Sequence, residues 1–337
     1  MKMQEARLYN RLAGQLVHCQ LCAHGCKIQE GKFGFCGVRQ NIKGVLYTHN
    51  YGKLVAVNTD PVEKKPLYHF FPGSLAFSIA SAGCNFRCGF CQNWQISQLN
   101  FLKESPPGEN FSADQVIALA KQHNCKSIAY TYTEPTIFFE FALEVAILAK
   151  KAGLANIFVT NGYMSSQAIS MFKPYLNAAN VDLKFFKESS YQRICSARLA
   201  PVLDSIRLLH EAGVWIEITT LVIPGANDSG ADLSGIAKFI AGISKDIPWH
   251  VSCFHADYKF TSYPSTPEQT IELAYDLGKA QGLRYVYTGN IHAWGQDTLC
   301  GQCKRFLIRR EGFNIAESNL AGNKCVFCQA ILPGVFS

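Results

Sequence analysis

Short runs of β-branched and aromatic residues alternate with longer segments of helical periodicity between residues 75 and 290. This alternation is typical of βα units whose strands form a parallel sheet, so we predict an α/β protein. Seven of the apolar runs have the length and composition of buried strands. They are residues 75–82, 127–133, 156–160, 179–184, 215–222, 249–254 and 284–287.

Two of the intervening helices have recognisable start signals. Ser112 with Gln115 forms one capping box and Thr266 with Gln269 forms another, in which side chains satisfy free backbone N–H groups at the helix start. Pro267 is expected at the first position of the second helix, because proline has no N–H group to leave unpaired there. We therefore predict helices that begin directly after Ser112 and Thr266.

Polar residues follow six of the predicted strands at their carboxyl ends. In parallel α/β proteins the loops at this edge lie together and contain the functional residues. The polar positions are Cys84, Thr133-Glu134-Pro135, Thr160-Asn161-Gly162, Asp182 with Lys184, Pro224-Gly225 and His255. The sequence thus predicts one site that all six positions share.

The composition favours a folded protein with a large core, because 48% of the residues are hydrophobic and 17% are charged. We expect neither a membrane span nor a signal peptide, since the chain has no run of about 18 apolar residues and no apolar segment behind its first residues. A cytoplasmic protein is therefore expected. We predict three regions: a Cys-rich N-terminal extension (residues 1–70), an α/β core (71–295) and a Cys-bearing tail (296–337).

Fourteen cysteines in a chain without an export signal indicate metal ligands, since a reducing cytosol disfavours disulfides. Eleven of them form three clusters. The clusters are Cys19, Cys22, Cys26 and Cys36; Cys84, Cys88 and Cys91; and Cys300, Cys303, Cys325 and Cys328. Cys125, Cys195 and Cys253 stand alone in or beside apolar runs, and we expect each to be a small buried hydrophobic residue.

The formal net charge of +7 is a weak indication of a nucleic-acid partner. It counts every thiol as neutral, whereas metal ligands are thiolates. With metals at all three clusters the formal charge falls to about +2. The sequence also has no basic patch interleaved with aromatic residues, so we do not expect nucleic-acid binding.

The central cluster, Cys84-x3-Cys88-x2-Cys91, offers three thiolates with no fourth cysteine nearby in the sequence. A structural zinc site or an electron-transfer cluster normally has four protein ligands, whereas three ligands leave one metal position open for a substrate or cofactor. The spacing therefore indicates a reactive iron centre. The alternative is a zinc site that a distant histidine completes.

This motif resembles that of the radical S-adenosylmethionine (SAM) superfamily, in which three cysteines hold a 4Fe-4S cluster and the fourth iron binds SAM. Nearly the whole chain is similar to one subgroup, the radical SAM enzyme of the AmmeMemoRadiSam system, which is related to the pyruvate formate-lyase activating enzymes. Besides both flanking cysteine clusters, the similar segments are Asp60-Pro61-Val62-Glu63-Lys64-Lys65-Pro66-Leu67, Cys91-Gln92-Asn93-Trp94 and Tyr130-Thr131-Tyr132-Thr133-Glu134-Pro135-Thr136. The resemblance implies a partial (β/α)6 barrel and possible partners that are Memo-like and AMMECR-like proteins.

The resemblance also implies cofactor contacts beside the cluster. Phe90 is implied to pack near the adenine of SAM, and Glu134 to receive the ammonium group. Tyr132 and Thr133 occupy the places of two glycines of the family, so the backbone hydrogen bonding usual for that turn is altered here. A structural alternative exists for Glu134, because a carboxylate before Pro135 also stabilises a helix N-terminus.

Two later strands add residues to the implied cofactor site. Thr160-Asn161-Gly162 is similar to a turn in the activating enzymes, although Val159 replaces the aspartate that often precedes that turn. Asp182 and Lys184 share one face of a strand, and the resemblance places Lys184 near the carboxylate of SAM. An internal salt bridge between the two is the alternative.

The last implied contacts come from the strands that follow. Val222 is implied to line the adenosine side, and His255 to approach the cofactor from the end of its strand. His250 lies in the same predicted strand, where we expect it to pack or to form a local hydrogen bond.

The tail contains two C-x2-C pairs, Cys300 with Cys303 and Cys325 with Cys328. The residues between them predict a short hairpin of strands 306–308 and 313–315. This pattern is typical of a zinc ribbon or a rubredoxin-like site, and zinc is our first choice, because a tail of about 40 residues needs a metal to stabilise it. The alternatives are an electron-relaying iron site and an interaction surface.

The first cluster, Cys19-x2-Cys22-x3-Cys26-x9-Cys36, is less specific. Its spacing suits a structural zinc or an auxiliary iron–sulfur cluster. His18 and His24 lie in the same stretch, so a mixed ligand set is also open. We favour four cysteines and a structural metal.

The function implied by the resemblance is radical chemistry. A reduced 4Fe-4S cluster, supplied by an external one-electron donor, cleaves SAM to a 5′-deoxyadenosyl radical that abstracts hydrogen from a small molecule or a protein. Positioning and exclusion of solvent are the tasks of the protein. The alternatives are an activase for a glycyl-radical enzyme and a non-catalytic metal-binding adaptor.

Overall fold

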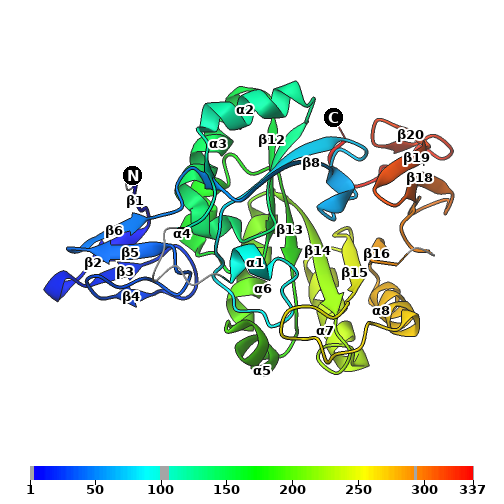
Figure 1. Ribbon diagram of the computed structural model, residues 1–337. Helices are drawn as coiled ribbons and strands as arrows, with labels where there is room; N and C mark the ends of the chain where they lie inside the picture. The colour runs from blue at the N-terminus through cyan, green and yellow to red at the C-terminus, as the bar shows by residue number, and fades with distance from the viewer. Residues whose placement is uncertain (1–3, 99–105, 292–293, 337) are drawn as a thin grey trace.

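The computed structural model describes residues 4–98, 106–291 and 294–336 of the chain (Figure 1). Its largest sheet has eight strands in the order β16-β15-β14-β13-β12-β11-β9-β8. Neighbouring strands are parallel except β8 and β9, which are antiparallel. The strands are β8 (Ala56–Pro61), β9 (Leu75–Ala80), β11 (Ser127–Tyr130), β12 (Ala155–Thr160), β13 (Ala178–Asp182), β14 (Trp215–Val222), β15 (Trp249–Cys253) and β16 (Val286–Gly289). The predicted α/β class is confirmed.

At least one helix lies between each parallel strand and the next. The α-helices are α1 (Trp94–Ser97), α2 (Ala113–Gln122), α3 (Phe139–Lys151), α4 (Ser166–Phe172), α5 (Glu188–Ser190), α6 (Leu199–Glu211), α7 (Gly230–Ile243) and α8 (Glu268–Ala280). Short 3-10 helices are η1 (Ala13–Gln15), η2 (Val62–Lys64) and η3 (Pro135–Phe138), and η4 (Tyr191–Cys195) is a π-helical turn. None of the helices in the described ranges combines the length and apolarity that a membrane span needs.

The predicted strands agree with the structure in position and differ at their ends. The run 215–222 coincides with β14, whereas the run 284–287 begins two residues before β16. The run 127–133 is shortened to β11, because Tyr132 has a left-handed φ of 62° and the chain turns there.

One of the two predicted helix starts is confirmed and the other is wrong. Ser112 accepts a hydrogen bond from the backbone N–H of Gln115 at 3.2 Å, and the Gln115 side chain accepts one from Ser112 N at 2.8 Å. Pro267 is the N-cap of α8 rather than its first residue, and Thr266 does not cap the helix. Its hydroxyl instead accepts from Phe254 N at 2.7 Å and donates to Val222 O at 2.6 Å, so that it links the ends of β14 and β15.

The sheet is buried on both faces near its centre. Every residue of β11 and five of the six residues of β9 are buried. Strands covered on both sides need apolar side chains at successive positions, which explains why these segments read as continuous hydrophobic runs. The core continues into the N-terminal region, since Val17 and Leu46 belong to the same packed cluster as Ile79.

The N-terminal region forms two small antiparallel sheets beside α3 and α4 (Figure 1). One consists of β1 (Gln4–Glu5), β6 (Val45–Thr48) and β5 (Arg39–Ile42), and the other of β2 (Tyr9–Arg11), β3 (Val17–Cys19) and β4 (Lys27–Ile28). A further pair joins β7 (Lys53–Leu54) to β10 (Glu109–Asn110). The predicted N-terminal region, residues 1–70, also contains β8, and this strand pairs with the main sheet.

The C-terminal tail packs near β16 and β8 (Figure 1). Its strands are β17 (Thr298–Leu299), β18 (Phe306–Glu311), β19 (Asn314–Ser318), β20 (Leu320–Ala321) and β21 (Lys324–Cys325). Strands β18 and β19 form the hairpin that the sequence predicted for residues 306–308 and 313–315, so that prediction is confirmed. The tail has its own small apolar cluster, to which Tyr285, Cys300 and Leu307 belong.

Candidate functional site

The central cysteine loop connects β9 to α1. The sulfur atom of Cys84 accepts a hydrogen bond from Phe86 N at 3.3 Å, and that of Cys91 lies 3.1 Å from the Ser97 hydroxyl. Cys88 is buried. Burial raises the pKa of all three thiols, although for Cys88 the contact with the thiol of Cys195 is the larger cause. A neutral thiol is therefore favoured until a metal compensates the thiolate charge.

Tight packing fixes the backbone of this loop. Its Gly89 has no room for a side chain, because an added Cβ would lie 2.5 Å from the Phe260 ring. The next residue, Phe90, is buried between the rings of Phe185 and Phe260. Gly89 N also donates to Ile194 O at 3.2 Å, which anchors the loop to η4. The cysteines are thus presented by a loop with little freedom to move.

A fourth cysteine, which sequence reasoning missed, contacts the loop. The three isolated cysteines are buried as expected, but the sulfur atom of Cys195 lies 3.5 Å from that of Cys88. These two residues are 107 positions apart, and nothing in the local sequence of Cys195 indicates the contact. Cys195 is positioned by η4, the π-helical turn whose last residues are hydrogen-bonded to the backbone of the cysteine loop.

The carboxylate of Glu134 is buried and held by four protein donors. Its Oε1 accepts from Thr136 N at 3.0 Å and from the hydroxyls of Thr136 and Thr160 at 2.5 and 2.8 Å. Its Oε2 accepts from Asn161 N at 2.8 Å. Burial raises the pKa of this carboxyl, and the hydrogen bonds partly offset that rise. The structural role that the sequence suggested, capping the helix after Pro135, is confirmed for η3. A role toward SAM stays a prediction.

The turn before Glu134 has a left-handed backbone conformation of the kind that glycine favours, although it contains no glycine. Tyr132 has a φ of 62°, in the left-handed region that costs a residue with a side chain about 1 kcal/mol. Two contacts compensate this cost: its hydroxyl donates to Asp60 Oδ2, and the Lys65 ammonium lies 4.4 Å from its ring centre. The neighbouring Thr133 hydroxyl donates to Ser81 O at 2.7 Å.

The structure explains the acidic and basic residues around position 60. The carboxylate of Asp60 accepts from Lys64 at 2.8 Å and from Lys65 at 2.6 Å, besides the Tyr132 hydroxyl. Burial raises the pKa of Asp60, but these donors outweigh it and hold the pKa well below its usual range. Asp60 is therefore a positioning residue for the Tyr132 turn, a link that the sequence pattern alone did not reveal.

Asn161 joins the turn after β12 to the cysteine loop. Its amide nitrogen donates to Asn85 Oδ1 at 2.7 Å and lies 3.8 Å from the sulfur of Cys84. The next residue, Gly162, has a φ of 70°, and an added Cβ would lie 2.9 Å from Val181. This turn therefore needs glycine, and it directs Asn161 toward the cysteines.

Asp182 and Lys184 lie on one face, as their spacing predicted. They form an ion pair with 2.8 Å between Lys184 Nζ and Asp182 Oδ2, the salt bridge considered as the alternative. Burial lowers the pKa of Lys184, but the Asp182 carboxylate outweighs it and raises the pKa overall. The ammonium lies 5.7 Å from the ring centre of Phe90. The pair is thus placed beside the cysteine loop, whereas its contact with SAM stays a prediction.

The last two strands bring Val222 and His255 to the same edge. Val222 is buried at the end of β14. His255 is exposed, and its ring nitrogens lie 3.2 and 3.4 Å from Nε2 of Gln92, the residue after Cys91. His250 forms a local hydrogen bond to Glu217 at 2.7 Å, as expected.

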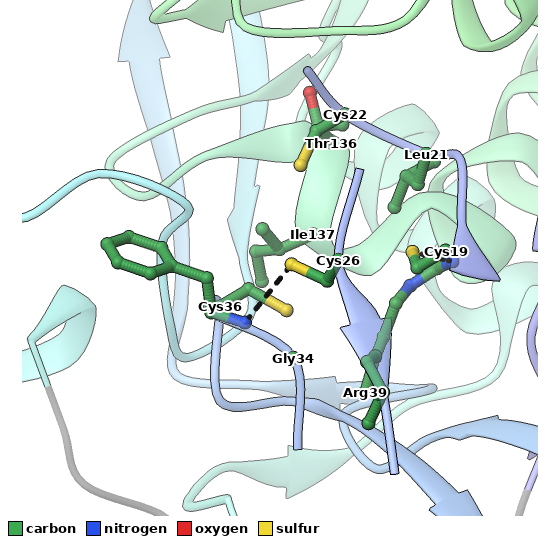
Figure 2. A pocket seen from close by; sticks show the side chains of 11 residues that line it. Cys19, Leu21, Cys22, Cys26, Gly34, Cys36, Arg39, Thr136 and Ile137 are labelled. Carbon is green, nitrogen blue, oxygen red and sulfur yellow. Dashed lines mark hydrogen bonds between the residues drawn. The ribbon is translucent and has the colours of Figure 1, made fainter. Parts of the chain in front are cut away.

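The two terminal cysteine clusters differ in the spacing of their sulfur atoms. All four C-terminal sulfurs lie within 4.8 Å of one another, with 3.5 Å between Cys300 and Cys328 and 3.8 Å between Cys303 and Cys325. A tetrahedral zinc with Zn–S bonds of about 2.3 Å separates its sulfurs by about 3.8 Å. The four-cysteine group is confirmed, and zinc as its metal stays a prediction. The N-terminal cysteines line one pocket with a wider spacing (Figure 2).

Comparison with known proteins agrees with this geometry. The family model described as the Radical SAM superfamily matches residues 78–239. An uncharacterized protein of Methanocaldococcus jannaschii is 40% identical over 330 residues, which cover 97% of this chain and 98% of that protein. Benzylsuccinate synthase activating enzyme of Thauera aromatica is 24% identical over 221 residues, which cover 58% of this chain and 65% of that enzyme.

A solved structure shares the fold. The radical SAM methyltransferase from Sphaerobacter thermophilus has a TM-score of 0.51 at 16% identity, and the match covers 65% of this chain and 67% of that one. The matched family segment contains the central cysteine loop and the ends of β9 to β14. From this match and the full-length relative, the chain belongs to the Radical SAM superfamily, whose members are enzymes, and is homologous to glycyl-radical enzyme activases.

Proposed function

We propose that Cys84, Cys88 and Cys91 hold a 4Fe-4S cluster, that SAM binds beside it, and that the enzyme generates a 5′-deoxyadenosyl radical that abstracts hydrogen from a substrate. The observation that carries this proposal is that three different strand ends converge beside the cysteine loop: Asn161 contacts Cys84 and Asn85, Glu134 is bonded to Asn161 N, and Lys184 lies over the Phe90 ring. A partial (β/α)6 barrel, open between the edge strands β8 and β16, is part of the same proposal.

The residues around the cysteines suit a cluster of thiolates. Phe86 N and the Asn161 amide are directed at Cys84, and the Ser97 hydroxyl is directed at Cys91. Hydrogen bonds to the sulfur atoms stabilise their negative charge and help to set the reduction potential of an iron–sulfur cluster. The buried position of Cys88 adds the low-polarity surroundings that shape the potential further.

The contact between Cys195 and Cys88 is compatible with an open fourth iron. Two thiolates bound to different irons of one cluster cannot stand in van der Waals contact, because the irons and their sulfides separate them. The Cys195 sulfur lies 3.5 Å from that of Cys88, so it contacts this ligand itself and is not positioned as a ligand of a separate iron. Three cysteine ligands therefore remain, and the fourth iron is free for SAM.

The polar residues beside the loop suit the amino acid end of SAM. Oε2 of Glu134 has one protein donor, Asn161 N, so it retains capacity to accept from an ammonium group. Lys184 provides a cation for the carboxylate, and Phe90 an apolar ring for the adenine. When bound and reduced, the cluster supplies the electron that cleaves the carbon–sulfur bond of SAM; the protein positions the cofactor and excludes water.

The test is anaerobic reconstitution with iron and sulfide, followed by a dithionite-driven assay for 5′-deoxyadenosine. Wild type is expected to form it, and Cys88→Ala to lose the activity completely, since two cysteines do not hold the cluster in place. Cys253→Ala, which removes a buried thiol outside the loop, serves as the matched control and is expected to stay active. A wild-type protein that holds a reducible cluster and forms no 5′-deoxyadenosine would contradict the proposal.

A second candidate is an activase for a glycyl-radical enzyme, which the similarity to the benzylsuccinate synthase activating enzyme favours. In that case the substrate is a glycine Cα–H of a partner protein rather than a small molecule. Mixing reduced enzyme and SAM with a glycyl-radical enzyme would then produce a protein-bound glycyl radical detectable by EPR. Memo-like and AMMECR-like proteins are the other proposed partners, and an external one-electron donor is needed in each case.

A further inference from the structure

The N-terminal cysteines surround a pocket between the small N-terminal sheets and the core. Cys19 ends β3, Cys22 and Cys26 lie in the loop before β4, and Cys36 precedes β5. Figure 2 shows the four sulfur atoms facing the space between these segments. The remaining lining is largely apolar and includes Leu21, Ile28, Phe35, Thr136 and Ile137. The pocket therefore has the four soft ligands and the low polarity of a metal–thiolate site.

The distances between the sulfur atoms distinguish this site from the C-terminal one. Among the described residues, the C-terminal set is the only group of three or more potential ligands whose atoms all lie within 4.8 Å of one another. The central cysteines, which as members of a radical SAM loop serve a multi-iron cluster, are likewise more widely spaced than that. A single ion draws its thiolates together, whereas a cluster spreads them, since each thiolate binds its own iron.

Hydrogen-bond donors reach the sulfur atoms of Cys19 and Cys26. Arg39 Nη1 lies 3.7 Å from the sulfur of Cys19, and Phe35 N lies 3.5 Å from that of Cys26. Such donors stabilise thiolates and are typical of iron–sulfur sites.

Arg39 gives an independent indication of buried negative charge in the pocket. Its side chain is 1% exposed and paired with Glu140, yet its Nε has no hydrogen-bond partner within the described part of the protein. Because an unpaired buried donor is costly, this nitrogen is better accounted for by an anionic group in the pocket it lines. A four-thiolate metal centre is such a group.

The pocket is also in contact with the central site. Nε2 of His24, two residues after Cys22, donates to Asn85 O at 2.7 Å, and Asn85 directly follows Cys84. The guanidinium of Arg87 lies over the Phe35 ring at 4.6 Å and donates to Cys84 O at 2.8 Å. Contacts of His24 and Arg87 therefore connect the two cysteine segments directly.

We propose that Cys19, Cys22, Cys26 and Cys36 hold a second four-iron cluster, in place of the structural metal that their sequence favoured, and that this cluster passes electrons to the central one. A low-potential one-electron donor reduces the N-terminal cluster. Transfer oxidises that cluster again and reduces the central cluster, so one electron moves while no bond forms or breaks and no proton has to move. The acceptor in this step rests on the proposed function, whereas the metal assignment does not.

Metal analysis of the reconstituted wild-type chain tests the assignment without any substitution. A second cluster predicts about eight irons and one zinc per chain, of which four irons belong to the central site. About four irons and two zincs would overturn it. Failure of the proposed function would instead appear as intact metal content without 5′-deoxyadenosine.

Matched variants locate the metals. Cys22→Ser with Cys26→Ser is expected to lose about four irons and to keep zinc. Cys300→Ser with Cys303→Ser is expected to lose zinc and to keep all its iron, and Cys125→Ser controls for removal of a thiol outside the clusters. Loss of zinc rather than iron from the first variant would overturn the proposal.

EPR spectroscopy of the dithionite-reduced protein tests the contact between the clusters. Two reduced clusters held by segments in direct contact are expected to give signals split or broadened by spin–spin interaction. The variant Cys22→Ser with Cys26→Ser is expected to give the simple signal of the central cluster alone. A wild-type spectrum equal to the sum of two unperturbed signals would overturn the transfer of electrons between them.

Discussion

The two ends of the chain each contribute four cysteines, yet they meet the core in opposite ways. The N-terminal cysteines lie against Asn85, Thr136 and Met164, which follow the carboxyl ends of β9, β11 and β12. The tail pairs Val335 with Phe70, before β9, and packs on Tyr285, before β16. One end therefore contacts the carboxyl edge of the sheet, where the central cysteine loop lies, and the other contacts its amino edge.

The packing agrees with this difference. The N-terminal region belongs to the large apolar cluster of the core, whereas the tail packs in a smaller cluster that it shares with Tyr68, Tyr285 and Tyr287. We therefore expect the tail, which has little core of its own, to need a metal at its four cysteines for stability, as compact metal-bound domains do. The N-terminal region is already stabilised by burial in the main cluster, so its fold depends less on a metal.

The largest effect is expected on removal of the tail metal. Cys325→Ser with Cys328→Ser should unfold the tail, because the free energy of metal binding stabilises the folded state. In small zinc domains this contribution is roughly 10 kcal/mol. Limited proteolysis should then cut the chain beyond residue 296 while 5′-deoxyadenosine formation by the core stays within about threefold of wild type. Complete loss of 5′-deoxyadenosine formation in a protein with a folded core would show that the tail cysteines do more than stabilise the tail.

Buried arginines anchor both ends and offer a matched pair of substitutions. Arg39→Met leaves the carboxylate of Glu140 buried without its partner, and a loss of about 3–5 kcal/mol in the free energy of unfolding is expected. Arg310→Met removes donors to Tyr68 O, Gln296 O and the Thr298 hydroxyl at 2.9–3.0 Å and a contact of 3.9 Å with the buried Glu63, so a loss of comparable size is expected. Hydrogen exchange should show opening at the N-terminal end in the first variant and at the tail in the second. Equal opening of both ends in either variant would show that they are not separate units.

Acid should loosen the tail through His69. Burial lowers the pKa of this histidine to about 4, and its ring is bonded to Pro333 O in the tail and to the Tyr287 hydroxyl. The folded pKa lies below that of the unfolded chain, so stability is fully present above about pH 6.5 and falls as the pH drops toward 4, by about 3 kcal/mol in total. Denaturant titrations at several pH values measure this, and His69→Gln should remove that part of the slope. An unchanged slope in His69→Gln would assign it to other groups.

The smallest effect is expected where the N-terminal region leads into the core. Tyr132→Phe removes the hydroxyl that donates to Asp60 and should cost about 1 kcal/mol. Tyr9→Phe, which removes an exposed hydroxyl bonded to Glu5, should cost less and serves as the control. Urea denaturation distinguishes the two, and equal losses would mean that Asp60 does not hold the turn.

The sequence was sufficient where the pattern is local. Continuous apolar runs predicted the buried strands, and Ser112 with Gln115 marked a helix start by a hydrogen-bond pair only three residues apart. Thr266 has the same local pattern, but the prediction that it caps a helix is wrong. Its hydroxyl instead forms hydrogen bonds to two strand ends that only the fold brings together. Local patterns do not show when tertiary contacts compete for the same group.

Contacts between distant segments were beyond the sequence. Arg39 and Glu140 are 101 positions apart, and His24 and Asn85 are 61 apart, yet both pairs decide how the N-terminal cysteines meet the core. The spacing of those cysteines in the sequence allowed a single ion or a cluster equally, and the proposal of a cluster rests on the separation of their sulfur atoms in the structure. The cofactor residues implied by the resemblance gather at one edge, but their roles toward SAM stay predictions.

The most direct test of the account is EPR spectroscopy of the reduced central cluster with and without SAM. The variant Cys22→Ser with Cys26→Ser is suited to it, because only the central cluster should remain. Binding of SAM to the open iron is expected to change the spectrum, and Cys88→Ala should show no such signal. A spectrum that SAM leaves unchanged, in a protein with a full central cluster, would contradict the central claim.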